Sequence, residues 1–111
     1  MAFEIKGSRI TMDAYDYGIQ LPFDIEEGEF EATDTMRFEL KKSKDSVTLV
    51  TKEYTNEISD NPNLFRFFLE FTKSESEVIP PGNYVYYIIY LKDGDVRDTL
   101  VSGETFKIKN G

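Results

Sequence analysis

Carboxylates are the side chains of this sequence that offer the most scope for catalysis or metal binding. The chain holds 21 Asp and Glu residues but no histidine and no cysteine, which excludes Ser-His and Cys-His pairs, imidazole ligands and disulfides. Glycoside hydrolysis needs two carboxyl groups that face each other across a cleft. Asp13 and Asp16, flanked by Tyr15 and Tyr17, come nearest to such a pair. A β-domain of 111 residues has little material left for a cleft, so we expect no catalytic residues and no enzyme.

The densest acidic run lies between Asp24 and Asp34, in the stretch DIEEGEFEATD. A calcium loop needs oxygen ligands at the spacing D-x-[DN]-x-[DN]-G, and neither this run nor Asp93-Gly94-Asp95 has that spacing. The nucleophile-elbow, P-loop and dinucleotide-binding glycine motifs are also missing from the sequence. We therefore expect no metal and no cofactor, and we interpret the run as a solvated acidic loop.

The net charge of -8 narrows the classes of partner. A phosphate backbone is bound through Lys and Arg, so an acidic chain is repelled by nucleic acid and by anionic membranes. The first ten residues, MAFEIKGSRI, lack the pattern of a signal peptide, and no apolar run approaches the length of a membrane span. We expect a protein that is cytoplasmic on synthesis and that contacts neither nucleic acid nor membrane.

Short stretches of alternating polarity recur along the whole chain, which predicts an all-β fold, an antiparallel β-sandwich of about seven strands. One domain is expected over residues 1–111. Thr72 and Glu75 have capping-box spacing before Pro80-Pro81, so one short helical turn is expected near residues 72–78. Pro22 indicates an edge position or a bulge. The expected strands are recognised by Phe3 and Ile5; Ile10 and Met12; Ile19 to Ile25; Met36, Phe38 and Leu40; 47–54; 64–71; 84–91; and Phe106 and Ile108.

Asp93-Gly94 is the strongest hairpin signal, because a type I′ turn needs positive φ at both central residues. A two-residue loop predicts by arithmetic that Lys92 faces Asp95. Continued without interruption, the same register sets Tyr90 opposite Arg97, Ile88 opposite Thr99 and Tyr86 opposite Val101.

The strand before this turn, YVYYIIYL from Tyr84 to Leu91, is apolar or aromatic at every position. One face of a strand in a sandwich packs on the opposite sheet, and the other face meets solvent unless something covers it. Three interpretations remain open: a central strand whose outer tyrosines tolerate water, a lid formed by the N-terminal segment, or an interface with another subunit or protein. Tyrosine suits an interface because it combines a large rigid area with a hydroxyl group.

The order of these features resembles a family of small Ig-like β-sandwich domains from phages and prophages of Firmicutes, similar to the N-terminal domain of phage baseplate upper proteins. The resemblance runs from about Gly7 to Ile108 and rests on structural motifs: a Gly-x-Tyr-x-Tyr pattern at Gly82, Tyr84 and Tyr86, a hairpin, and the pair Thr99-Leu100. It implies that Tyr84, Tyr86, Ile88 and Tyr90 face inward. The outward residues are then Val85, Tyr87, Ile89 and Leu91.

Family members often carry a polar residue where this chain has Tyr87, so the outer face is more apolar than the resemblance implies. We therefore expect a partner-binding surface at Val85, Tyr87, Ile89 and Leu91. The expected function is a non-enzymatic structural or adaptor protein of a phage tail or baseplate, associated with the virion, whose partners are other tail proteins or further copies of itself. The alternative is a carbohydrate-binding module that stacks exposed tyrosines on sugar rings.

Overall fold

The computed structural model describes residues 9–15, 17–18, 20–26, 29–57 and 61–110, together with the backbone of residues 3–6. These residues form eight strands and one helix, which confirms the predicted all-β fold with one strand more than the seven expected. The Ig-like sandwich assignment stays a prediction. The elements are β1 (Phe3–Lys6), β2 (Arg9–Asp13), β3 (Leu21–Ile25), β4 (Thr35–Lys41), β5 (Thr48–Thr55), β6 (Phe65–Leu69), α1 (Lys73–Val78), β7 (Gly82–Lys92) and β8 (Asp95–Lys109).

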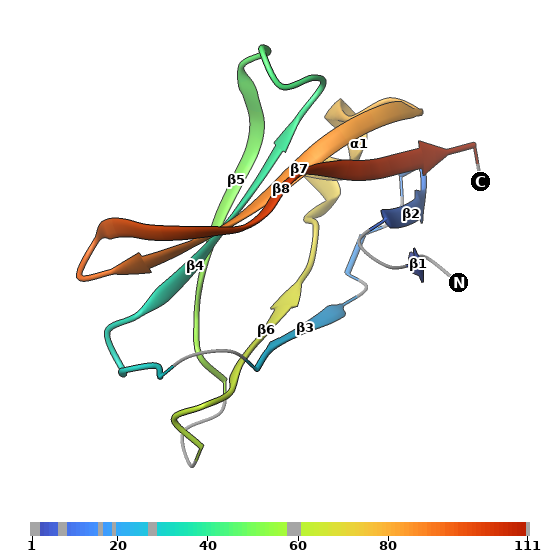
Figure 1. Ribbon diagram of the computed structural model, residues 1–111. Coiled ribbons are helices and arrows are strands. Elements are labelled where there is room, and N and C mark those ends of the chain that lie inside the picture. The colour runs from blue at the N-terminus through green and yellow to red at the C-terminus, as the bar shows by residue number, and fades with distance from the viewer. Residues whose placement is uncertain are drawn as a thin grey trace.

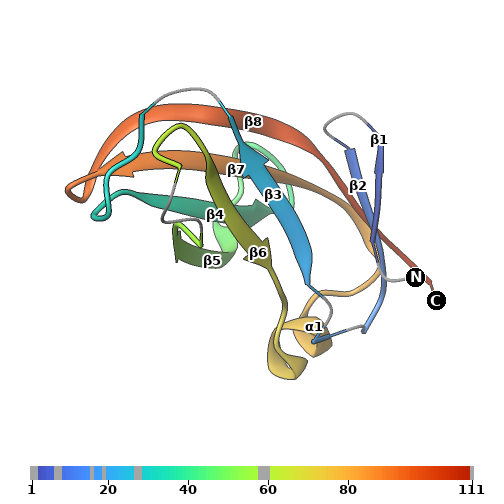
Figure 2. The same cartoon turned by 90° about the horizontal axis from the view of Figure 1, so that it is seen from below.

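The strands form two sheets (Figure 1). The larger sheet has six strands in the order β1-β2-β8-β7-β4-β5, and the smaller sheet pairs β3 with β6. The β2–β8 pair is parallel, so the predicted antiparallel arrangement is wrong for this pair. The other pairs are antiparallel as expected. Seen from below, β3 and β6 lie across β4 and β7 of the larger sheet (Figure 2). The larger sheet is therefore covered on one face by the smaller one.

Alternating apolar residues supply the core that the two sheets share. On β4, Met36, Phe38 and Leu40 are fully buried, while the residues between them are partly exposed. The Phe38 ring meets the Phe71 ring edge-on, with 6.1 Å between centroids. The buried members of the core from the two sheets include Ile10, Met12, Leu21, Met36, Phe38, Leu40, Phe65, Phe67, Leu69, Tyr84, Tyr86, Ile88, Phe106 and Ile108.

Pro22 lies in β3, which pairs only with β6, so Pro22 is on an edge strand as predicted. Proline has no N–H to donate, and an edge strand leaves half of its backbone groups without a neighbouring strand. The β3–β6 register runs without a break from Leu21 to Ile25. The proline therefore causes no bulge.

Helix α1 confirms the predicted capping box. The Thr72 hydroxyl accepts a hydrogen bond from the Glu75 N–H (3.2 Å), and the Glu75 carboxylate accepts one from the Thr72 N–H (2.8 Å). The helix stops after six residues, because proline follows at positions 80 and 81. No helix in the described part of the chain is long and apolar enough to cross a membrane.

The β7–β8 hairpin confirms the predicted turn but not the predicted register. Asp93 and Gly94 have φ of 52° and 83°, and Lys92 faces Asp95. Beyond that pair the register shifts at three places, so Tyr90 faces Asp98, Ile88 faces Val101 and Tyr86 faces Glu104. Each shift adds one residue to β8. Such bulges increase strand twist and cannot be derived from the turn alone, which is why the arithmetic register was wrong.

Candidate functional site

The inner face of β7 packs into the core as the resemblance implied. Tyr84, Tyr86 and Ile88 are 3%, 1% and 0% exposed. Tyr90 is partly buried and packs against the same cluster. Burial raises the pKa of Tyr86 to about 12, because the phenolate would lose its hydration.

The outer face of β7 carries the residues predicted to bind a partner. Val85, Tyr87 and Ile89 are partly exposed. Leu91 is only 1% exposed, so its predicted outward position does not bring it to the surface, and it does not belong to the candidate surface. We call Val85, Tyr87 and Ile89 the outer row.

Charged side chains of β4 flank the outer row. Arg37 lies opposite Ile89, and Glu39 lies opposite Tyr87. The Arg37 and Glu39 side chains pair at 3.6 Å, and the Lys41 ammonium lies 5.1 Å from the centre of the Tyr87 ring. Long charged side chains cover apolar neighbours with their aliphatic stems while their heads stay in water. The outer row is therefore partly shielded by its own sheet.

The described strands of the N-terminal segment do not form the lid that was one of the three open interpretations. Strand β1 pairs with β2, and β2 pairs with residues 106–109 of β8. Both strands therefore extend the edge of the larger sheet, beyond β8, instead of lying over β7 (Figure 1). Among the described residues, the outer face is left to side chains of the sheet itself.

A buried carboxylate, Asp34, lies at the end of the inner row, by which we mean the core-facing residues Tyr84, Tyr86, Ile88 and Tyr90. It closes the acidic run that was predicted to be a solvated loop, and for Asp34 that prediction is wrong. Asp34 is 0% exposed. It accepts hydrogen bonds from the Glu31 N–H (2.8 Å) and the Tyr90 hydroxyl (2.7 Å), and the Lys92 ammonium lies 3.6 Å away. Burial alone raises the pKa of Asp34, but these hydrogen bonds and the Lys92 charge outweigh burial and leave it lowered. Asp34 thus ties the loop before β4 to the end of β7.

Of the carboxylate pair considered for catalysis, the structure describes only Asp13. Asp13 lies 3.7 Å from the Lys109 ammonium, and Asp16 lies outside the described residues. Tyr15 and Tyr17 are 55% and 52% exposed. Among the described residues, no three acidic side chains group as a metal site would require.

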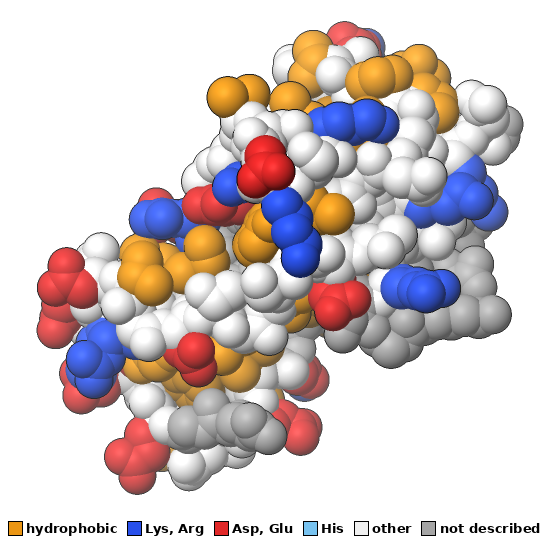
Figure 3. Space-filling model, turned by 45° about the horizontal axis from the view of Figure 1, so that its top comes forward, with side chains coloured by type: hydrophobic (Ala, Val, Ile, Leu, Met, Phe, Trp, Pro, Cys, Tyr) orange, Lys and Arg blue, Asp and Glu red, His pale blue; other side chains and the backbone are white. Residues whose placement is uncertain are grey.

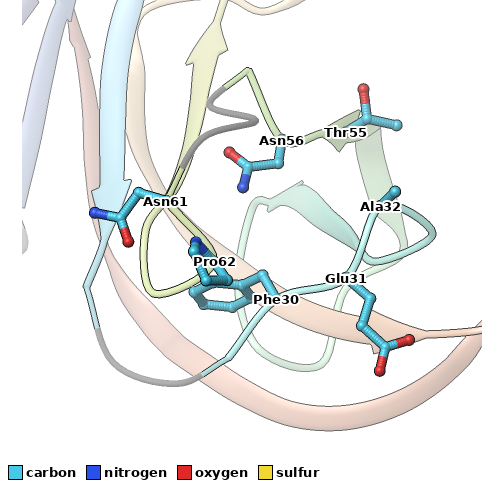
Figure 4. A pocket seen from close by; sticks show the side chains of 7 residues that line it. All are labelled: Phe30, Glu31, Ala32, Thr55, Asn56, Asn61 and Pro62. Atoms are coloured by element: carbon cyan, nitrogen blue, oxygen red, sulfur yellow. The ribbon is translucent and has the colours of Figure 1, made fainter.

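A cavity of about 370 Å³ lies between the loop before β4 and the loop before β6 (Figure 4). Its amides already have structural partners. The Asn56 side chain donates to the Leu64 carbonyl and accepts from the Arg66 N–H, and the Asn61 side chain accepts from the Asn63 N–H. Figure 4 shows Glu31 directed away from the other lining side chains. This cavity therefore brings together no groups that suggest catalysis.

A second depression, of about 620 Å³, lies at the start of β7 and carries positive charge. Among the described residues, three cations and no carboxylate line it; the lining residues are Arg9, Lys42, Ser43, Lys44, Asn83, Tyr84, Val85 and Thr105. We call it the basic groove. Lys42 and Lys44 stand close together in the sequence, but the contribution of Arg9 to the groove depends on the order of strands in the sheet.

Comparison with known protein families, with curated proteins and with solved structures found no match for this chain.

Proposed function

We propose that this chain is a non-enzymatic structural or adaptor protein that works through protein contacts at the outer row. The observation that carries the proposal is the unequal covering of the larger sheet. The smaller sheet packs on one face only, and Val85, Tyr87 and Ile89 stay partly exposed on the other. Aromatic and aliphatic side chains on a central strand are the composition typical of the middle of an interface.

An Ig-like architecture is part of this proposal, and the strand order supports it. In an immunoglobulin-type sandwich, strands G, F and C are neighbours in one sheet, strand C′ can extend that sheet, and B and E pair in the other. The orders β8-β7-β4-β5 and β3-β6 follow that scheme. The Tyr84 hydroxyl also donates to the Pro80 carbonyl at 2.6 Å, as in the tyrosine corner at the start of strand F.

The biological setting we propose is a phage or prophage tail or baseplate, where the chain would be associated with the virion. The support is the resemblance to Ig-like domains of phage baseplate upper proteins, which covers nearly the whole chain. Domains of a tail act by holding neighbouring subunits in repeated copies, and this requires contact surfaces instead of catalytic side chains.

The test is the composition of tail particles purified from cells that encode and produce this chain. Mass spectrometry should find the wild-type chain in the particles in a fixed ratio to the other tail proteins. Tyr87→Asp should give a folded protein that is missing from the particles, while Ser74→Asp, an exposed change on α1, should be retained. Particles without the wild-type chain would contradict the setting, and retention of Tyr87→Asp would contradict the surface.

A second candidate function is carbohydrate binding, and one observation favours it. Tyr15 and Tyr17 are each more than half exposed, and exposed aromatic rings stack on sugar rings. Calorimetric titration with a panel of glycans tests this function. Binding that Tyr15→Ala and Tyr17→Ala abolish would support it, and no heat with any glycan would remove it.

A further inference from the structure

We propose that the tip of the β7–β8 hairpin of one copy docks in the basic groove of a second copy. This contact shares Val85 with the outer row and adds a second surface to the function proposed above. It follows from the charges at the two ends of the hairpin, the exposed apolar residue at its tip, and the distance between the ends.

The basic groove offers cations that have no carboxylate partner among the described residues. Arg9, Lys42 and Lys44 line it, and none of them forms one of the ion pairs of the described chain. Lys42 is held in place, since its ammonium lies 4.6 Å from the centre of the Tyr84 ring and donates to the Asn83 carbonyl at 3.2 Å. The chain has a net charge of -8, so this positively charged groove is a site where an anionic group can bind.

The hairpin tip has the complementary chemistry. Asp93, Asp95 and Asp98 are exposed, and none of them takes part in the ion pairs between described residues. Between them Val96 is 60% exposed, which gives the tip an apolar contact for Val85 in the groove. Arg97 is the one cation of residues 93–100, so the tip is acidic overall.

The shape of the hairpin makes the tip a protruding element. Every residue from 95 to 100 is exposed, and β2 pairs only with residues 106–109 of β8. Figure 1 shows the hairpin reaching to the left, away from α1 and from both chain ends. On its other side, β7 pairs with β4 as far as Leu91, and the Thr33 hydroxyl donates to Asp93 at 3.3 Å. The part of the hairpin that can enter a groove without rearranging the core is therefore the turn and residues 95–100 of β8.

The tip and the groove cannot meet within one chain. The groove is lined by Asn83, Tyr84 and Val85 at the start of β7, and the tip follows Lys92 at its end. Ten residues of strand separate Tyr84 from Gly94, which is roughly 33 Å at about 3.3 Å per residue. In Figure 3, the charged side chains on the right are Lys and Arg, while Asp and Glu lie at the left and lower margins together with a few Lys and Arg. A tip that docks in the groove therefore belongs to another molecule.

Because the contact joins two different patches, each copy both supplies a tip and receives one. Two antiparallel copies can satisfy both contacts, and further copies can close into a ring. Salt screens these local attractions and also the mutual repulsion of two acidic chains. Reversing the charges of the groove and of the tip by substitution is therefore a sharper test than measuring association at several salt concentrations.

The experiment is light scattering of full-length protein over a wide range of concentration, with circular dichroism as the test of folding. The wild type should exceed the monomer mass of 12.9 kDa as concentration rises. The groove variant Lys42→Glu with Lys44→Glu should stay monomeric, and so should the tip variant Asp95→Lys with Asp98→Lys. An equimolar mixture of these two variants should associate again, because every groove then faces a tip of opposite charge.

The matched control is Glu53→Lys with Glu77→Lys, which changes the net charge as much as the tip variant does but lies on β5 and α1. It should associate like the wild type. A wild type that is monomeric throughout, or a mixture of the charge variants that stays monomeric, would overturn the inference. Association that both charge variants retain but Tyr87→Asp loses would also overturn it, while supporting the outer row as the interface.

Discussion

The two faces of strand β7 have nearly the same composition and different surroundings. Tyr84, Tyr86 and Ile88 point into the core and are at most 3% exposed. The outer row has one tyrosine and two aliphatic residues in place of two tyrosines and one isoleucine, and all three stay partly exposed. The difference comes from what lies opposite each face, because the aromatic layer of β3 and β6 covers only one of them. Apolar residues on both faces of a strand therefore do not mean that both faces are buried in the core.

The comparison of the two faces is tested most strongly by a pair of truncations. Phe38→Ala removes a fully buried ring that contacts the Tyr86 and Phe106 rings, and it should lower the free energy of unfolding by about 4 kcal/mol. Tyr87→Ala on the outer face should cost less than about 1 kcal/mol, as expected for a partly exposed site. Urea denaturation measures both values, and equal losses would mean that the outer face is packed as tightly as the core.

The polar end of the inner row offers the next largest effect. Asp34→Asn removes the charge that accepts the Tyr90 and Glu31 hydrogen bonds, and it should cost about 2 kcal/mol at neutral pH. The lowered pKa of Asp34 means that the native state favours the carboxylate. Its stabilisation is present above the ordinary value of 3.8 and is lost as the pH falls through the lower native pKa.

Denaturation curves at neutral and at acidic pH check this sign. The gap in stability between wild type and Asp34→Asn should narrow as the pH drops below 3.8. Tyr90→Phe serves as the control, because it removes one donor and leaves the charge in place. A gap that stays constant with pH would contradict an ionised Asp34 in the native state.

The other end of the inner row should show a smaller effect. The Tyr84 hydroxyl donates to the Pro80 carbonyl at 2.6 Å. Tyr84→Phe keeps the ring and removes this bond, so we expect a loss of about 1 kcal/mol in the free energy of unfolding. Thermal unfolding followed by circular dichroism measures it. A variant as stable as the wild type would show that the corner is held by packing of the ring alone.

Local patterns explain which parts of the fold were predictable from the sequence. Alternating polarity placed Met36, Phe38 and Leu40 on one face of a strand. The spacing of Thr72 and Glu75 predicted the start of α1. Each of these patterns spans only a few residues of sequence. The turn at Asp93-Gly94 was equally local. Each of these predictions is confirmed.

The remaining features depend on contacts between distant segments. Leu91 was expected to be exposed because side chains alternate between the two faces of a strand. Its exposure also depends on residues of neighbouring strands, which this alternation does not describe. Asp34 meets Tyr90 across 56 positions of sequence, and Arg9 joins Lys42 only because β2 lies beside β8. The candidate surface was therefore predicted in part, and the basic groove was not.

The last prediction concerns the outer face, at the bulge of Gly103. This residue has a φ of +69°, and an added Cβ would lie 2.8 Å from the Lys44 Cε and 3.4 Å from the Tyr87 hydroxyl. Gly103→Ala should cost about 1 kcal/mol from the left-handed backbone. Gly94→Ala is the matched control, because it has a φ of +83° and nothing within 4 Å. Urea denaturation of both variants separates the cost of the backbone conformation from the cost of the contact with Lys44. Equal losses in the free energy of unfolding would mean that the Lys44 side chain moves aside without cost. A larger loss at Gly103 would mean that Lys44 is held against Tyr87 as part of the outer face.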